Sequence, residues 1–309
     1  MVSTTRSELG ASVVSSKKDK LRVAVPAANL IGESPVWSVR EQALYWADVE
    51  GKLVQRFDPV SGALASWSMP EVTSCIGLRK SPTGLVAGCR TGFVLLDTHS
   101  GKVTPLSDPE AHVPGNRFND GKVDRAGRFW AGTKNLANSP ETTGAVYRLD
   151  PDHRVHRVDR GISCTNGIAW SPDERTMYLC DTWLRRIYAY DFDRDAGSVS
   201  NRRLFAELAT AQGYPDGLTV DAEGYIWNAH YDGWRITRYA PDGHVDRVLR
   251  LPVQHVTSLM FGGPDLRTLF VTSASLRLPP QARGQQPLAG HVFALEPGVD
   301  GLPEPEFLG

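Results

Sequence analysis

Polar side chains recur at one position of a repeated sequence pattern, where each precedes a short apolar segment, a turn and a second apolar segment. They belong to Glu33, Asn119, Asn166 and Asp216. Carboxylate and amide oxygens are the ligands that hard divalent cations such as Ca, Mg or Mn prefer. No histidine or cysteine stands at this position, so a tetrahedral structural zinc site is disfavoured. Repulsion between Glu33 and Asp216 favours a bound cation over the alternative, in which short polar residues line a water-filled channel.

Copies of the pattern follow one another along the chain. They begin at Glu33, Ile76, Asn119, Asn166, Asp216 and Ser258, in steps of 43, 43, 47, 50 and 42 residues. Repeats of this length built from short strands are typical of propellers, with one blade per repeat. The sequence therefore predicts an all-β fold, a six-bladed β-propeller with four antiparallel strands per blade. Equivalent positions form a ring about the axis, which is where we expect a metal ion and the chemistry.

The predicted blades need one another to bury their faces, so we expect a single propeller domain over residues 21–309. The segment 21–26, LRVAVP, is expected to be the outer strand of the last blade and to close the ring. Residues 1–20 are rich in Ser, Thr and Lys and are predicted to form a disordered tail. The Pro-rich end 301–309, GLPEPEFLG, is expected to pack along the rim.

Further candidate side chains stand near the repeated position. Arg117 precedes Asn119 by two residues, and a guanidinium group beside an amide suits a hydroxylated or anionic substrate. An exposed salt bridge is the alternative interpretation of Arg117. His230 and Asp181 stand at the ends of second strands and could line the same mouth, although a histidine with a structural role is the commoner case.

Two segments are too long for tight hairpins. Residues 134–144, KNLANSPETTG, follow the second strand of the third repeat, and long loops on a rigid scaffold commonly carry binding groups. The insertion 276–290, LRLPPQARGQQPLAG, is either a surface excursion or part of the wall of the site.

Composition argues against several classes of function. A formal net charge of -1, from 34 basic and 35 acidic residues, argues against a nucleic-acid or anionic-membrane partner. No apolar run reaches the length of a membrane span and no secretory signal segment is found, so we expect a cytoplasmic location. The 4 cysteines form no CxxC pair and are predicted to be buried free thiols. Motifs for nucleotide and Ser-hydrolase chemistry are missing, and the oligomeric state stays open.

The longer motifs resemble a known family. GESPVW, NRFNDGKVDRAGRFWAGT, TNGIAWSPDERTMYLCDT, YPDGLTVDAEGYIW and FGGPDLRTLFVTSA occur in order and at the expected spacing. They look like the senescence-marker-protein/gluconolactonase/regucalcin family, over nearly the whole chain from about residue 29 onward. The resemblance implies a six-bladed propeller with one divalent metal ion near the central channel. The metal ligands that it implies are Glu33, Asn166 and Asp216, and the substrate-binding residues are Arg117 and Asn119.

The resemblance also bears on the substrate. Family members hydrolyse sugar lactones, and some relatives act on other esters. Some members carry a further acid that contacts the substrate, in the loop after the second strand of the third blade. In this chain that loop begins with Lys134 and carries Glu141 later, so no equivalent acid is assigned. The identity of the sugar lactone therefore stays open.

These observations predict a metal-dependent hydrolase that converts a small-molecule sugar lactone to the aldonic acid. The ion, which is Ca, Mg, Mn, Zn or Fe, would polarise the lactone carbonyl and stabilise the oxyanion. Asp216 is the predicted catalytic residue that takes a proton from the attacking water, and metal-bound water or hydroxide is the competing source of the nucleophile. The alternatives are a calcium-binding regulatory propeller without turnover, a promiscuous esterase or phosphotriesterase, and a structural interaction propeller.

Overall fold

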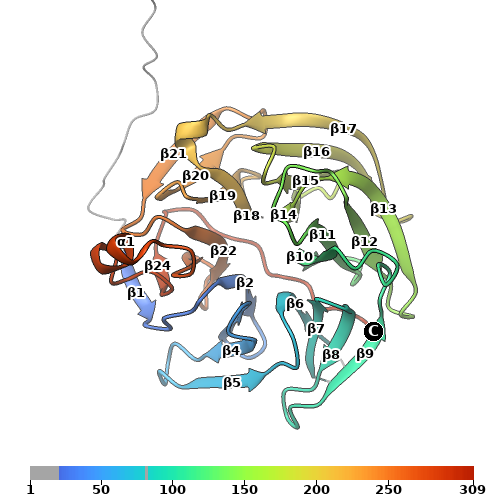
Figure 1. Ribbon diagram of the computed structural model, residues 1–309, viewed down its shortest axis with the longest axis horizontal. Coiled ribbons are helices and arrows are strands. Elements are labelled where there is room, and N and C mark those ends of the chain that lie inside the picture. The colour runs from blue at the N-terminus through green and yellow to red at the C-terminus, as the bar shows by residue number, and fades with distance from the viewer. Residues whose placement is uncertain (1–20, 81–82) are drawn as a thin grey trace, which may run out of the picture.

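Short antiparallel sheets surround a central axis in the computed structural model, which describes residues 21–80 and 83–309 (Figure 1). Over these residues the strands form six four-stranded sheets, and the strands of each sheet follow one another outward from the axis. This arrangement confirms the predicted six-bladed propeller. The disordered tail predicted for residues 1–20 lies outside the described residues.

Each blade contributes one strand to each of four layers around the axis. The innermost strands are β2 (Gly32–Ser38), β6 (Thr73–Arg79), β10 (Asn116–Val123), β14 (Thr165–Trp170), β18 (Tyr214–Val220) and β22 (Val256–Gly262). The second strands are β3 (Ala43–Asp48), β7 (Gly84–Cys89), β11 (Phe129–Asn135), β15 (Thr176–Asp181), β19 (Ile226–Tyr231) and β23 (Thr268–Ser273). The third strands are β4 (Leu53–Phe57), β8 (Gly92–Leu96), β12 (Gly144–Leu149), β16 (Arg186–Asp193), β20 (Arg235–Tyr239) and β24 (Val292–Leu295). The outer strands are β5 (Leu64–Ser68), β9 (Val103–Ser107), β13 (Val155–Ile162), β17 (Ser198–Glu207), β21 (Val245–Arg250) and β1 (Arg22–Val25).

Helical structure is confined to two short segments of the described chain, a 3₁₀ turn at Thr210–Gln212 and helix α1 at Pro280–Gln285. Across residues 21–80 and 83–309, no helix has the length and apolar character that crossing a membrane would require. The 4 cysteines are all buried and unpaired, as predicted.

Strand β1 closes the ring as the sequence predicts. It pairs in antiparallel fashion with β24, placing Val23 opposite Phe293 and Arg22 opposite Ala294. The last blade therefore combines three strands from the end of the chain with one from its beginning. This pairing covers the edge that β24 would otherwise expose.

A recurring turn joins the first and second strands of blades three and five. Asp124 accepts hydrogen bonds from the backbone of the turn and, at 2.8 Å, from the indole nitrogen of Trp130. Asp221 does the same in blade five, where the indole nitrogen of Trp227 donates to it over 2.8 Å. Both tryptophans are fully buried between strands, so each turn is tied to the apolar core.

A bulge interrupts each innermost strand close to the axis. Between paired positions on either side of the bulge, the innermost strand advances one residue more than its partner. The shifts lie at Glu33/Val36, Thr73/Cys75, Phe118/Asp120, Asn166/Ile168, Pro215/Leu218 and Val256/Leu259. Bulges bend a strand and redirect its side chains, so these positions are where the sheets turn polar groups toward the axis.

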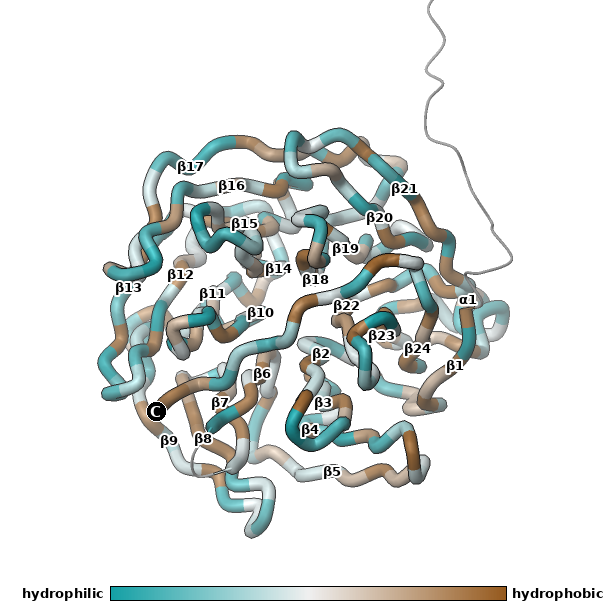
Figure 2. The backbone as a smooth tube through the Cα atoms, turned by 180° about the vertical axis from the view of Figure 1, so that it is seen from behind, coloured by the Kyte–Doolittle hydropathy of each residue, from teal (hydrophilic) through white to brown (hydrophobic). Residues whose placement is uncertain are grey.

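The C-terminal segment takes a different course from the predicted one. Figures 1 and 2 show that it crosses the propeller axis on the face seen in Figure 2 and does not follow the rim. The fully buried Phe307 pairs with Arg79 of blade two. Midway, the carboxylate of Glu304 lies 3.7 Å from Lys122 Nζ. The burial of Phe307 in blade two, on the far side of the axis, accounts for the path of the C-terminal segment across the channel.

Candidate active site

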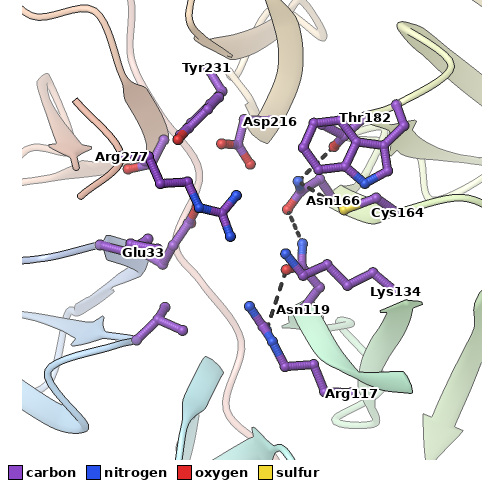
Figure 3. A pocket seen from close by; sticks show the side chains of 14 residues that line it. Glu33, Arg117, Asn119, Lys134, Cys164, Asn166, Thr182, Asp216, Tyr231 and Arg277 are labelled. Carbon is purple, nitrogen blue, oxygen red and sulfur yellow. Dashed lines mark hydrogen bonds between the residues drawn. The ribbon is translucent and has the colours of Figure 1, made fainter. Parts of the chain in front are cut away.

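A pocket of about 550 Å³ lies at one end of the channel (Figure 3). Every residue assigned a role from the sequence lines it: Glu33, Arg117, Asn119, Asn166 and Asp216. They come from the innermost strands of blades one, three, four and five, at or beside the bulges. The structure thus brings together residues that are far apart in the chain.

The amide side chains form a chain of hydrogen bonds from blade three to blade five. Asn119 Nδ2 donates to Asn166 Oδ1 and to the carbonyl of Thr165, both over 2.9 Å. Asn166 Nδ2 donates to Thr182 Oγ1 over 2.7 Å, and this hydroxyl donates to the carbonyl of Pro215 over 2.9 Å. Asn166 Nδ2 also donates to Cys164 Sγ over 4.0 Å, so both amide donors of Asn166 are used within the protein. Its Oδ1, which accepts from Asn119, keeps a lone pair for a ligand.

The carboxylates of Glu33 and Asp216 are buried, and their negative charges are destabilised there. Burial raises the pKa of Glu33 well above its ordinary value, and the charges of Asp216 and Asp120 raise it further. Burial and the charge of Asp120 likewise raise the pKa of Asp216. Glu33 Oε2 accepts one bond, from the backbone nitrogen of Ser34, over 3.1 Å. Asp216 Oδ1 is buried without a hydrogen-bond partner among the described residues.

This donor set fits a hard divalent cation. The oxygens of Glu33, Asn166 and Asp216 line one pocket, and the unpartnered Asp216 Oδ1 is an acceptor in need of a positive partner. In the part of the chain that the structure describes, no three His, Cys, Asp or Glu side chains are grouped to hold a metal ion. A cation here would therefore depend on the amide oxygen of Asn166 as its third protein ligand.

Asp120 and Gly167 hold the bulges of blades three and four together. Asp120 Oδ2 accepts from the backbone nitrogen of Gly167 over 2.8 Å, beside Asn166. Gly167 has φ of +40°, and a Cβ there would lie 2.7 Å from the carbonyl oxygen of Asp216. Glycine is required because the backbone passes so close to the strand that carries Asp216.

Three cationic side chains share the pocket with these groups. Arg117 and Lys134 are buried, and Arg277 is exposed. The exposed salt bridge considered for Arg117 is therefore wrong. Lys134 begins the long segment 134–144, and Arg277 belongs to the insertion 276–290, so both segments contribute to the wall of the site.

The sequence did not single out Arg277, Trp183 or Tyr231 as pocket residues. All three line the pocket, Trp183 two residues after β15, Tyr231 at the end of β19 and Arg277 four residues after β23. Their common signal is a location within four residues of the end of a second strand. Applied to every blade, that rule would have drawn attention to these positions.

Other candidates lie elsewhere. Ile76 and Ser258 line a second cavity deeper in the channel, and Thr257 is the residue of the innermost strand of blade six that lines the pocket. Asp181 and His230 are buried outside the pocket lining. Asp181 accepts hydrogen bonds from the Ser163 backbone, and His230 Nδ1 bonds the carbonyl of Gln212 over 2.9 Å. The structural interpretation of His230 therefore agrees with its contacts.

Together, these features define a six-bladed β-propeller with an oxygen-rich pocket at one end of its channel. Residues 31–275 match the family model described as SMP-30/Gluconolactonase/LRE-like region, and the chain belongs to this family. It is 39% identical over 292 residues to 6-deoxy-6-sulfogluconolactonase from Pseudomonas putida, covering 94% of this chain and 99% of the relative. It is 34% identical over 296 residues to human regucalcin, again covering 94% and 99%. Among solved structures, the calcium-binding protein regucalcin from Agrobacterium tumefaciens superposes with a TM-score of 0.90 at 28% identity, covering 97% of this chain and 99% of that one. The predicted family is thereby confirmed.

Proposed function

We propose that the protein hydrolyses a sugar lactone to the corresponding aldonic acid with the help of a bound divalent cation. The observation that carries the proposal is the buried, unpartnered Oδ1 of Asp216 in a pocket shared with Glu33 and Asn166. The family description and the name of the Pseudomonas putida relative, a sulfogluconolactonase, support a sugar lactone as substrate. Calcium is one candidate ion, in keeping with the description of the Agrobacterium protein.

Glu33, Asn166 and Asp216 would hold the cation. When bound, the ion supplies Lewis-acid polarisation of the lactone carbonyl and positive charge for the developing oxyanion. The hydrogen bonds from Asn119 to Asn166 and from Asn166 to Thr182 fix the direction of the ligand oxygen. Such contacts behind a ligand are a usual requirement for an ordered metal site.

The remaining pocket residues would bind substrate and move a proton. Arg117 supplies guanidinium donors, and Asn119 supplies its amide oxygen toward the sugar hydroxyls and the ring-oxygen side of the lactone. Asp216 accepts a proton from the attacking water at the carboxylate oxygen that the cation leaves free.

The test is hydrolysis of five- and six-carbon aldonolactones by protein treated with a chelator and then resupplied with single cations. We expect turnover to disappear on chelation and to return with at least one of Ca, Mg, Mn, Zn or Fe. Full activity of the metal-free protein would reject the proposal. A comparison of kcat/KM on lactones and aryl esters would separate a lactonase from a promiscuous esterase.

A calcium-binding protein without turnover is the second candidate. The likeness to regucalcin, described as a calcium-binding protein, favours it. Tight calcium binding measured by calorimetry, together with no turnover across the lactone panel, would support this candidate over the lactonase.

A further inference from the structure

Arg117, Lys134 and Arg277 form a cluster of cations in the pocket. Arg117 lies on β10 and Lys134 on β11, whereas Arg277 follows β23 and extends toward them from across the pocket (Figure 3). Arg117 is only 8% exposed and Lys134 only 7%. Among the described residues, no carboxylate lies within 4.0 Å of any of the three charged groups.

The contacts of these cations within the protein do not neutralise them. Arg117 Nη1 donates to the carbonyl of Phe118 over 2.7 Å, and Lys134 Nζ donates to Asn138 Oδ1 over 2.9 Å. Both acceptors are neutral. Burial and the charges of Arg117 and Arg277 together lower the pKa of Lys134 to about 8, against an opposing effect of the charge of Asp216. Buried cations are normally paired, so this cluster lacks an anion.

Glu33 and Asp216 do not supply that anion. In the proposed enzyme, both carboxylates are ligands of a divalent cation, whose two positive charges balance theirs. The charges of Arg117, Lys134 and Arg277 then remain unmatched. Lysine and arginine side chains only donate hydrogen bonds, whereas a sugar hydroxyl both donates and accepts. A group that only accepts and carries negative charge fits the cluster better than a hydroxyl does.

We propose that this cation cluster recognises an anionic substituent of the substrate, a sulfonate, phosphate or carboxylate carried on a carbon away from the lactone carbonyl. Lys134 determines this charge preference, with its ammonium group held in place by Asn138. Arg277 closes the cluster from the insertion 276–290. This assignment of substrate class rests on the proposed lactonase function.

The experiment compares kcat/KM of the metal-loaded protein for gluconolactone and for gluconolactones carrying a sulfonate, phosphate or carboxylate at carbon six. We expect the anionic lactones to exceed the neutral one by about tenfold or more, the usual scale for a charge-assisted hydrogen bond. The ranking of the three anions identifies which group the site accepts. Equal values for neutral and anionic lactones would overturn the proposal.

Variants of the pocket cations test which residues cause the preference for anionic lactones. Lys134→Gln should lower kcat/KM for the preferred anionic lactone by about tenfold or more beyond any loss that it causes with the neutral lactone. Arg277→Gln should act in the same direction but less, because Arg277 is exposed. Lys134→Arg should restore part of the preference. Lys102→Gln, which removes an exposed cation on the outer side of blade two, is the matched control and should change neither substrate. An equal loss on both substrates in Lys134→Gln would contradict the role of Lys134.

A binding measurement separates this inference from the proposed function. Calorimetric titration compares gluconate with its 6-sulfonate, in wild-type protein and in Lys134→Gln. Tighter binding of the sulfonate, lost in the variant, supports the anion site even when no lactone is turned over. Failure of catalysis with a retained anion preference would reject only the lactonase, whereas equal binding of both acids would reject the anion site.

Discussion

Asp216 combines a buried carboxylate with an oxygen that has no hydrogen-bond partner in the described chain. Such an arrangement costs stability, because burial and neighbouring negative charge both raise its pKa. We therefore predict that Asp216→Asn lowers kcat by about 100-fold or more, the scale of general-base and metal-ligand losses. In the presence of a chelator, the same variant should unfold at an equal or higher temperature than the wild type, because it removes an unfavourable charge.

Thermal unfolding with and without added cation checks both parts of this prediction. The wild type should gain stability with the cation, and Asp216→Asn should gain less, since ligand binding to the folded state raises its stability. A lower unfolding temperature of the variant in chelator would show that Asp216 is a structural residue instead.

His230 makes a separate prediction about acid stability. Burial lowers its pKa from 6.5 to about 4. The unfolded chain therefore binds a proton at this side chain between pH 6.5 and pH 4, whereas the folded chain does not, so stability falls as the pH falls through that window. The loss approaches about 3 kcal/mol below pH 4.

The variant His230→Asn isolates this contribution, because asparagine can still donate to the carbonyl of Gln212. Urea unfolding of both proteins at pH 7 and pH 4.5 measures the difference. We expect a smaller loss of unfolding free energy in the variant. Equal losses in the two proteins would mean that other groups control acid unfolding.

The sequence predicted the oxygen ligands of the pocket better than it predicted the positively charged residues of the pocket. Glu33, Asn166 and Asp216 recur at one repeat position, so their proximity follows from counting residues. Lys134 and Arg277 do not repeat, and each reaches the pocket through a segment particular to its own blade. Their meeting depends on the path of long loops, which residue spacing does not determine.

At the scale of elements, the bulges decide which side chains reach the pocket. Strand alternation predicts which face a residue occupies, but one extra residue in each innermost strand resets that alternation. In blade five the bulge lies between Pro215 and Leu218, and in blade six between Val256 and Leu259, so Thr257 is the residue equivalent to Asp216. The count that placed Ser258 in the ring was therefore wrong by one residue, and Thr257 lines the pocket. The blades were predictable because each contains local turn signals and apolar segments. The bulges of blades four and five have a weaker signal, the glycines Gly167 and Gly217 within the innermost strands.

A substitution of Gly167 tests whether the bulge of blade four positions the cation ligands. Its φ of +40° and the 2.7 Å approach of a Cβ to the Asp216 carbonyl leave little room for a side chain. Gly167→Ala should lower the unfolding free energy by about 1–3 kcal/mol and weaken cation binding, because it displaces Asn166 and Asp216 together. Gly115→Ala is the matched control, since no atom lies within 4 Å of its added Cβ. Chemical unfolding measures the change in stability, and calorimetry measures the change in cation binding. Unchanged cation affinity would show that the bulge does not position the cation ligands.

At the scale of the whole molecule, the ring is held together at two places. Strand β1 joins the two ends of the chain within the last blade, and the C-terminal segment spans the axis. The segment pairs Gly301 with Asp221 of blade five and Phe307 with Arg79 of blade two, so it links blades on opposite sides of the channel. Closure by β1 was predictable from one unmatched strand, whereas the crossing was not, because a short Pro-rich segment has no repeat partner.

Phe307 tests whether this crossing stabilises the entire propeller. Its ring is fully buried, so Phe307→Ala should lower the unfolding free energy by about 3–5 kcal/mol in a single cooperative transition. Leu308→Ala is the control, and because Leu308 is 50% exposed its loss should stay below about 1 kcal/mol. The pocket lies outside the contacts of Phe307, so kcat/KM for the lactone should be unchanged below the unfolding temperature. If instead the segment anchors only itself, hydrogen exchange will show local opening of residues 301–309 while global unfolding stays close to that of the wild type, since local opening costs less than unfolding the whole ring.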